Sequence, residues 1–307
     1  MVQQALCASS TGTAGTIERG PLAGERLWVW MDVSGTCNLT CRDCYTKQSH
    51  EPVLVSEDQF RDTLNKFAAS GASFEKLHLN WRGEPMTNKR LARMLALRNE
   101  IMPGTPIEFH TNGLLLTEKN SAAIIAQTIP EDLVYVSIDG GNREGHEGNR
   151  GEGSWEPTLA GLEMLLDARD AAAPERRPHL GIYEICYDRR SRYDETLIAL
   201  SKRCASWTRV NEIKRTGDER PFNYVDAPQG PCFWVGNALC ITARGDVHVC
   251  LLSFRPDGRV GNIRRDTLES IVHNAREYRE RIADKGRDQI AHCRGCQKTE
   301  GTIDEPE

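Results

Sequence analysis

The sequence contains no apolar run that approaches the roughly 20 residues needed to cross a membrane. Its first 25 residues lack the basic start and the apolar stretch of a secretory signal, and we expect residues 1–25 to form a flexible tail. Both absences disfavour a membrane protein and a secreted one. We therefore expect a cytoplasmic protein with no membrane partner.

An excess of basic residues is also missing. The 307-residue chain has 39 Lys and Arg residues against 44 Asp and Glu residues, which gives a formal net charge of −5. Proteins that bind the phosphate backbone of nucleic acids usually carry positive charge, so we expect no nucleic-acid partner. A mildly acidic surface is compatible with a cationic substrate.

Cysteine, in contrast, is abundant, with eleven residues. In a cytoplasmic chain such a number favours metal binding or catalysis over disulfides. Three of the cysteines lie together in C-N-L-T-C-R-D-C-Y at 37–45, with the spacing C-x3-C-x2-C. A [4Fe-4S] cluster usually takes four thiolates. This group therefore raises the question of what binds the fourth iron.

The segment 26–215 alternates short apolar runs with longer amphipathic ones. This alternation predicts βαβ units and a parallel sheet, and six repeats fit an α/β fold with a partial (β/α)6 TIM-like barrel. The expected strands are 26–33, 76–81, 106–112, 133–139, 179–188 and 209–215, and the expected helices are 56–71, 88–102, 117–129, 156–172 and 191–206. In such sheets the chemistry lies at the carboxyl ends of the strands, where the cysteine loop follows the first strand.

The loops after the predicted strands resemble those of the radical S-adenosylmethionine (SAM) superfamily. The resemblance rests on the cysteine loop, W-R-G-E-P (81–85), H-T-N-G (110–113), V-S-I-D-G (136–140) and H-E-G-N-R-G-E-G-S-W-E (146–156). Two positions depart from the family pattern. Arg82 replaces the first Gly of G-G-E, and Asp43 stands before the last cysteine, where an aromatic residue is common.

This resemblance implies which residues bind the cofactors. Three thiolates would hold three irons, and the fourth iron would stay open to the amino and carboxylate groups of SAM. The implied cluster ligands are Cys37, Cys41 and Cys44, and the implied SAM-binding residues are Glu84, Asn112, Ser137 and Arg150. An electron from an external one-electron reductant, of the flavodoxin or ferredoxin type, would then cleave SAM. The resulting 5′-deoxyadenosyl radical would abstract hydrogen from a substrate carbon.

The region 216–307 resembles the auxiliary iron–sulfur domains called SPASM and twitch. The resemblance rests on the segment 230–250, on R-V-G-N-I (259–263) and on C-R-G-C at 293–296. It implies a small domain with a β-hairpin and a helix (267–284), which holds a second [4Fe-4S] cluster. Its implied ligands are Cys232, Cys250, Cys293 and Cys296. A single C-x2-C unit favours the shorter twitch type and disfavours a zinc ribbon, which would need two such units.

Cys240 is left over from both clusters. The segment around it reads as a hairpin that turns at Arg244-Gly245, which places Cys240 opposite Val249 or Cys250. Three interpretations remain open: a cluster ligand, a packed strand cysteine, or a thiol that donates hydrogen to a substrate radical. Cys250 is the alternative donor. Cys186, at the end of the fifth predicted strand, is a weaker one.

The compact barrel with one auxiliary cluster resembles radical SAM enzymes that act on aminoglycosides, namely the neomycin epimerase family and 2-deoxy-scyllo-inosamine dehydrogenase. A spare thiol favours an epimerase, because inversion requires hydrogen to return from the opposite face. A dehydrogenase would instead need a base and an exit for an electron. A peptide-modifying enzyme is a further alternative, disfavoured because only about 25 residues precede the barrel. A noncatalytic electron carrier would have no use for SAM-binding residues.

Three histidines, His78, His110 and His248, lie in predicted strands. We expect them to pack in the core or at its rim, because the cysteines suffice for both clusters. His110 adjoins the active face, within reach of SAM or substrate.

Overall fold

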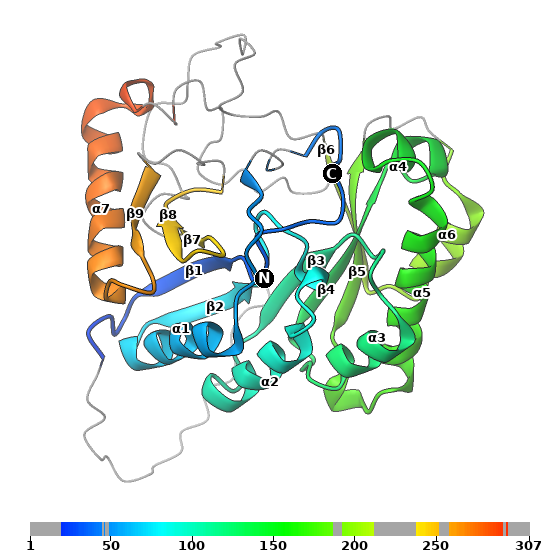
Figure 1. The fold of residues 1–307 in the computed structure, drawn as a ribbon, viewed down its shortest axis with the longest axis horizontal. Coiled ribbons are helices and arrows are strands. Elements are labelled where there is room, and N and C mark those ends of the chain that lie inside the picture. Colours follow the sequence, from blue (N-terminus) through cyan, green and yellow to red (C-terminus); the bar gives the residue numbers. More distant parts are fainter. Residues whose placement is uncertain are drawn as a thin grey trace, which may run out of the picture.

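The computed structural model describes residues 20–44, 46, 49–186, 192–211, 238–251, 258–290 and 293. Within these residues the strands form one nine-stranded sheet in the order β6-β5-β4-β3-β2-β1-β7-β8-β9 (Figure 1). The strands are β1 (Arg26–Met31), β2 (Ser73–His78), β3 (Ile107–Thr111), β4 (Leu133–Asp139), β5 (His179–Cys186), β6 (Ser206–Asn211), β7 (Ala238–Ile241), β8 (Asp246–His248) and β9 (Arg259–Asn262).

Strands β1 to β6 are parallel, and helices connect them. The helices lie along the outside of the sheet, and α7 packs beside β9 at the end of the sheet opposite α6 (Figure 1). They are α1 (Glu57–Ser70), α2 (Leu91–Ile101), α3 (Glu118–Ile125), α4 (Arg143–Arg150), α5 (Trp155–Ala171), α6 (Glu195–Ser201) and α7 (Leu268–Lys285). Short 3-10 turns occur at Pro85–Thr87, Pro174–Arg176 and Arg287–Gln289. The predicted α/β fold with a partial barrel is confirmed.

Helix boundaries follow local hydrogen bonding. Ser56 and Gln59 form a reciprocal capping box at the start of α1, and Gly71 ends that helix with a φ of 75°. Thr117 and Asn120 form the equivalent box at the start of α3. These boundaries agree with the predicted helices at 56–71 and 117–129 to within a few residues, although α3 ends at Ile125.

The second strand lies three residues earlier than predicted. Residues 76–81 are the expected strand, but β2 spans Ser73–His78. The reason is that the backbone N–H groups of Trp81 and Arg82 both donate to Asp32 Oδ1, at 2.7 Å each, instead of continuing a strand ladder. The chain therefore leaves the sheet just before W-R-G-E-P.

The outward side chains of the barrel strands form the main core beneath the helices. Leu77, Phe109, Val134 and Ile182 are at most 1% exposed, and they belong to the same cluster as Phe60 of α1. Burial of such side chains provides most of the stabilisation of the fold. The opposite, inner face of the strands is far more polar and bears the site.

The carboxyl-terminal strands continue the barrel sheet. Strand β7 runs parallel to β1, and Trp30 of β1 is in register with Cys240 of β7. Strands β8 and β9 then follow antiparallel. The proposed domain boundary at 215/216 stays a prediction, because residues 212–237 lie outside the described residues.

The hairpin register differs by at least one residue from the prediction. Cys240 lies opposite His248, not opposite Val249 or Cys250. The turn encloses three residues, because Thr242 N–H donates to Asp246 O at 2.9 Å and Gly245 N–H donates to Thr242 O at 2.7 Å. Gly245 has a φ of 88°, a left-handed conformation that glycine adopts without strain.

Candidate cofactor site

The cysteine loop follows β1 and is held by the segment that contains Arg150. The backbone N–H of Arg42 donates to Asn149 O, and that of Asp43 donates to Asn149 Oδ1, each at 2.8 Å. One asparagine side chain and its carbonyl thus fix the loop between the second and third cysteines. This contact joins two motifs that lie more than 100 residues apart in the sequence.

The three thiols of this loop are half-buried neighbours that influence one another. Burial is the main cause that raises the pKa of Cys37 to about 11, and the charges of Glu84, Cys41 and Cys44 act in the same direction. For Cys44, burial also acts to raise the pKa, but hydrogen bonds from His50 and Thr46 outweigh it and bring the value to about 7. Iron binding would deprotonate all three thiols.

A cluster and a single metal ion place different demands on these thiols. Among the described residues, no three His, Cys, Asp or Glu side chains converge on one point as the ligands of a single metal ion would. A [4Fe-4S] cluster makes a different demand, because each thiolate binds a different iron. The assignment of Cys37, Cys41 and Cys44 as ligands stays a prediction.

Glu84 lies at the centre of the predicted SAM site. Its carboxylate is 4% exposed and accepts hydrogen bonds from Thr111 Oγ1 (2.7 Å), Asn112 N–H (2.8 Å) and Met86 N–H (3.0 Å). Burial raises the pKa of Glu84, although these hydrogen bonds oppose the shift. The carboxylate is therefore held rigidly, with acceptor capacity left for a cationic group.

Asn112 connects this carboxylate to the cysteine loop. Its side-chain amide donates to Asn38 Oδ1 at 2.8 Å, while its backbone N–H binds Glu84. Gly83 allows the chain to approach the end of β1, because a Cβ there would stand 2.0 Å from the carbonyl oxygen of Ser34. The glycine of W-R-G-E-P is thus required by close packing of backbone on backbone.

Arg150 lies beside the same site. Its guanidinium donates to both carboxylate oxygens of Asp139, at 2.8 and 3.1 Å. Its charge lowers the pKa values of Cys41 and Glu84, although burial raises both values overall. Four predicted residues, Cys41, Glu84, Asn112 and Arg150, are therefore brought together at the carboxyl ends of the strands. Direct contact of Arg150 with SAM stays a prediction.

Ser137 lies on the inner face of β4, half-buried, two residues before Asp139. It occupies the same strand end as the ion pair of Arg150 with Asp139. This position agrees with the predicted contact to SAM, which stays a prediction.

Asp32 is a residue that sequence reasoning missed. It is buried, and its carboxylate accepts a hydrogen bond from Arg82 Nε at 3.0 Å in addition to the two backbone N–H groups described above. The guanidinium of Arg82 also lies over the ring of Trp81, 4.7 Å from its centroid. Arg82 therefore replaces the family glycine with a buried ion pair at the end of β1. The sequence feature that could have predicted this ion pair is the presence of Asp32 and Arg82 after neighbouring strands.

Trp81 joins the barrel to the auxiliary region. Its indole N–H donates to the carbonyl oxygen of Leu251 at 2.8 Å, and its ring lies 5.7 Å from that of His248. Cys250 is half-buried and Cys293 is buried. The other two predicted auxiliary ligands, Cys232 and Cys296, lie outside the described residues. All four ligand assignments stay predictions.

Cys240 has no exposed surface. It packs with Trp30, Trp81 and Ala238 in a small apolar cluster on the inner side of the sheet. Burial raises the pKa of Cys240 well above its ordinary value, and the neighbouring Cys250 raises it further. The thiol therefore stays protonated at neutral pH. A substrate would reach its Sγ only after Trp30 or Trp81 turned aside.

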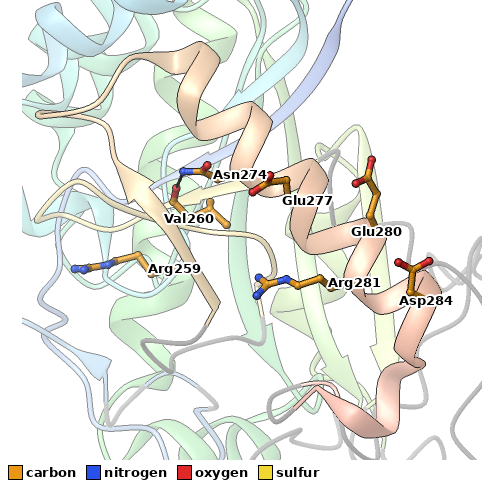
Figure 2. Close-up of a pocket in the computed structure, with 7 residues that line it drawn as sticks. All are labelled: Arg259, Val260, Asn274, Glu277, Glu280, Arg281 and Asp284. Carbon is orange, nitrogen blue, oxygen red and sulfur yellow. Dashed lines mark hydrogen bonds between the residues drawn. The ribbon is translucent and has the colours of Figure 1, made fainter.

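A pocket of about 510 Å³ lies elsewhere, between β9 and α7 (Figure 2). Its walls carry both signs of charge, and Asn274 Nδ2 donates to Val260 O at 2.8 Å across one side. The lining residues are Arg259, Val260, Asn274, Glu277, Glu280, Arg281 and Asp284. None of them belongs to the cofactor site, so we assign this pocket no part in it.

Comparison with known proteins supports this reading of the site. The sequence matches the radical SAM superfamily over residues 31–170 and the iron–sulfur cluster-binding SPASM domain over residues 232–297. It is 31% identical over 146 residues to "AdoMet-dependent heme synthase" of Methanosarcina barkeri, which covers 47% of this chain and 40% of that protein. It is 25% identical over 138 residues to "Mycofactocin maturase MftC" of Mycolicibacterium smegmatis, and this match covers 45% of this chain and 33% of that protein. The matches thus span less than half of either relative.

Solved structures show the same fold at low sequence identity. BtrN in complex with AdoMet and 2-DOIA superposes with a TM-score of 0.55 at 16% identity, covering 93% of this chain and 98% of that one. Native anSMEcpe with bound AdoMet superposes with a TM-score of 0.62 at 14% identity, covering 83% of each chain. SAM and two [4Fe-4S] clusters are the cofactors that this combination of domains binds. The chain therefore carries a radical SAM domain over residues 31–170, followed by an iron–sulfur cluster-binding domain of the SPASM type over residues 232–297.

Proposed function

We propose that the protein is an epimerase of a neomycin-type aminoglycoside, in which the thiol of Cys240 returns hydrogen to the substrate carbon. The bound cofactors would supply the abstraction of a hydrogen atom from that carbon. The observation that carries the proposal is a fully buried thiol on the inner side of the sheet, outside both predicted ligand sets. Epimerisation is the outcome that needs such a thiol.

The surroundings of Cys240 suit a hydrogen donor. Donation of a hydrogen atom requires S–H and not the thiolate, and burial in the Trp30, Trp81 and Ala238 cluster keeps the thiol protonated. After donation, the sulfur must regain one electron, from the external reductant, and one proton, from solvent. Cys250 lies close enough to influence the pKa of Cys240, and it is the alternative donor.

The nature of the substrate rests on broader features. A net charge of −5 suits a cationic ligand, and BtrN, which shares the fold, was solved with AdoMet and 2-DOIA. One relative is named a maturase, and anSMEcpe, which shares the fold, was also solved with AdoMet and a Cp18Cys peptide; both support the competing possibility of a peptide substrate. The substrate class is therefore the part of the proposal that an experiment must decide first.

An anaerobic reaction in D₂O tests the proposal. Reconstituted protein, reductant, SAM and a panel of aminoglycosides are incubated together, and the products are analysed by mass spectrometry. An epimerase gives a product heavier by one deuterium together with 5′-deoxyadenosine, because an exchangeable thiol delivers the label. A product two mass units lighter, with no label on carbon, would identify a dehydrogenase instead. Unchanged sugars together with a modified peptide would reject both.

A further inference from the structure

Four titratable side chains converge on the inner face of β2 and β3. Glu108 Oε2 lies 2.8 Å from Lys76 Nζ, and Glu108 Oε1 lies 3.0 Å from His110 Nε2. The same Oε1 lies 3.4 Å from His78 Nδ1. One carboxylate thus holds two imidazoles and an ammonium group, none of which belongs to the predicted cofactor site.

These side chains are not packed as a core. Their exposed fractions are 26% for Lys76, 14% for His78, 12% for Glu108 and 23% for His110. The interior of a closed eight-stranded barrel is instead filled by branched aliphatic residues. The inner face of this partial barrel therefore presents partly exposed polar groups, and the half-buried positions of His78 and His110 agree with the expected place at the rim of the core.

Aromatic rings line the same face. The ring centroid of His110 lies 4.9 Å from that of Tyr135 and 4.6 Å from that of Tyr183, and the His110 and Tyr183 rings meet edge to face. Trp30 stacks on His78 at 4.3 Å with an angle of 11°. Flat apolar rings beside hydrogen-bonding groups suit the C–H face and the hydroxyls of a saturated hydroxylated ring.

The cluster lies directly beside the predicted SAM site. His110 precedes Thr111 and Asn112, both of which donate hydrogen bonds to Glu84. Its backbone N–H donates to Asn80 Oδ1 at 2.8 Å, which fixes the chain at this point. A substrate bound next to SAM on the inner face would therefore contact the imidazole of His110.

The electrostatics keep Glu108 ionised beside the two histidines. Burial alone would raise the pKa of Glu108, but hydrogen bonds from His110 and His78 hold it well below its usual range, so the carboxylate stays ionised. Burial lowers the pKa of His78 and of His179, which also faces this wall. In the neutral tautomer whose Nε2–H donates to Glu108, the lone pair is on Nδ1, for which the described residues provide no hydrogen-bond partner.

We propose that His110, oriented by Glu108, is a catalytic base that takes the proton of the hydroxyl group on the reacting carbon of a hydroxylated ring. The proposal rests on the proposed function only in assigning an alcohol carbon as the reacting centre. Glu108 is a positioning residue, since it acts through His110.

The proton and electron balance can be followed for either product. Homolysis of the substrate C–H bond leaves a carbon radical, and the hydroxyl proton moves from oxygen to His110 Nδ1. In an epimerase, Cys240 S–H supplies a hydrogen atom to the opposite face and the proton returns to oxygen. In a dehydrogenase, the proton stays on His110 while one electron passes to an iron–sulfur acceptor, and a C=O bond forms. His110 thus serves both outcomes.

Chemical labelling tests access to His110 without knowledge of the substrate. The reconstituted holoenzyme with bound SAM is treated with diethyl pyrocarbonate, and the modified histidines are mapped by mass spectrometry. We expect His110 to be labelled, with the exposed His273 on α7 as the positive control. A His110 that stays unlabelled while His273 reacts would overturn the proposal.

Variants then test the role in turnover with the aminoglycoside panel. We expect His110→Gln to slow product formation by about 100-fold, because the hydroxyl proton loses its acceptor. Free imidazole should restore activity to His110→Ala, and Glu108→Gln should shift the pH profile of turnover. His273→Gln is the matched control. Normal turnover by His110→Gln would overturn the proposal. If no sugar is turned over, the proposed function fails, while the labelling result still decides whether His110 is accessible to a ligand.

Discussion

At the scale of single residues, burial of Cys240 keeps its thiol in the protonated S–H form. A thiol between Trp30 and Trp81 stays in the S–H form and is shielded from solvent oxidants. The same rings would control access to it, so hydrogen return would depend on movement of a tryptophan. Such a movement would separate in time the abstraction of hydrogen from the substrate and the return of hydrogen by Cys240.

We expect Cys240→Ala to abolish epimerisation, by more than about 100-fold, while SAM cleavage continues, because the substrate radical loses its donor. Product and 5′-deoxyadenosine are quantified in the same reaction. Cys204→Ala is the matched control, since this half-buried thiol lies just beyond α6 on the outer side. Loss of iron from Cys240→Ala would instead identify Cys240 as a cluster ligand.

The buried His146 should make the free energy of unfolding depend on pH. Burial lowers its pKa to about 4, the charge of Arg150 adds to this, and Nδ1 accepts a hydrogen bond from Asp139 N–H at 3.2 Å. In the unfolded chain His146 takes up a proton near pH 6.5. The contribution of the neutral imidazole to the free energy of unfolding is therefore fully present above that pH and is lost as the pH falls towards 4. We expect a loss of about 2 kcal/mol between pH 7 and pH 5, measured by urea unfolding. His146→Asn, which retains an acceptor, should remove most of this slope, and an unchanged slope would contradict the assignment.

The proximity of the predicted site residues could be expected where short motifs follow neighbouring strands, while their roles stay predictions. The cysteine loop, Glu84, Asn112 and Arg150 follow from short motifs, and the structure brings representatives of each together. Asp32 and the group around Glu108 were not predicted, because their partners come from other strands. The inner or outer orientation of His78 and His110 depends on strand register, which the sequence alone did not establish.

At the scale of elements, the turn after β2 determines the position of Glu84. Gly83 passes so close to Ser34 that any side chain would displace the backbone, and Glu84 follows immediately. The turn is anchored on the other side by Asp32, which holds two of its N–H groups. The carboxylate is therefore positioned by the backbone on both sides.

We expect Gly83→Ala to weaken SAM binding by at least about 10-fold, because shifting the turn moves Glu84 away from Thr111 and Asn112. Binding is measured by anaerobic calorimetry on the reconstituted protein. Gly148→Ala is the matched control, since a Cβ at that helical position meets no atom within 4 Å. Equal affinities for the two variants would contradict this account of the turn.

Most elements agreed with the sequence pattern, and the differences have local causes. The predicted strand 133–139 agrees with β4, because the alternation of its apolar residues is regular. The hairpin register was wrong by at least one residue, since turn size depends on the hydrogen bonds of Thr242, and a pattern of residue types does not reveal them. The β2 boundary was wrong because a buried carboxylate, not a neighbouring strand, binds the backbone of Trp81 and Arg82.

At the scale of the whole molecule, β1 lies inside the sheet. Strand β2 pairs with one side of it and β7 with the other. The barrel is therefore completed at this side by strands from the carboxyl-terminal region and not by a loop.

In the described part of the chain, no helix is both long and apolar enough to cross a membrane.

We expect a fragment of residues 1–215 to aggregate, because removal of β7 exposes the unpaired edge of β1 together with Trp28 and Trp30. Size-exclusion chromatography and light scattering compare the fragment with the full chain under anaerobic conditions. A monodisperse fragment with native helix content by circular dichroism would show instead that the barrel is an independent unit.

The pairing of β1 with β7 also limits how such proteins can be recombined. Four consecutive residue pairs, from Trp28↔Ala238 to Met31↔Ile241, join the two regions by backbone hydrogen bonds. A carboxyl-terminal region taken from another enzyme would have to pair with β1 in this register. It would also have to provide a carbonyl oxygen at the position of Leu251, which accepts the hydrogen bond from the indole of Trp81. The auxiliary region is therefore part of the same sheet as the barrel, and a chimera that exchanges it should keep β1 and β7 from the same parent protein.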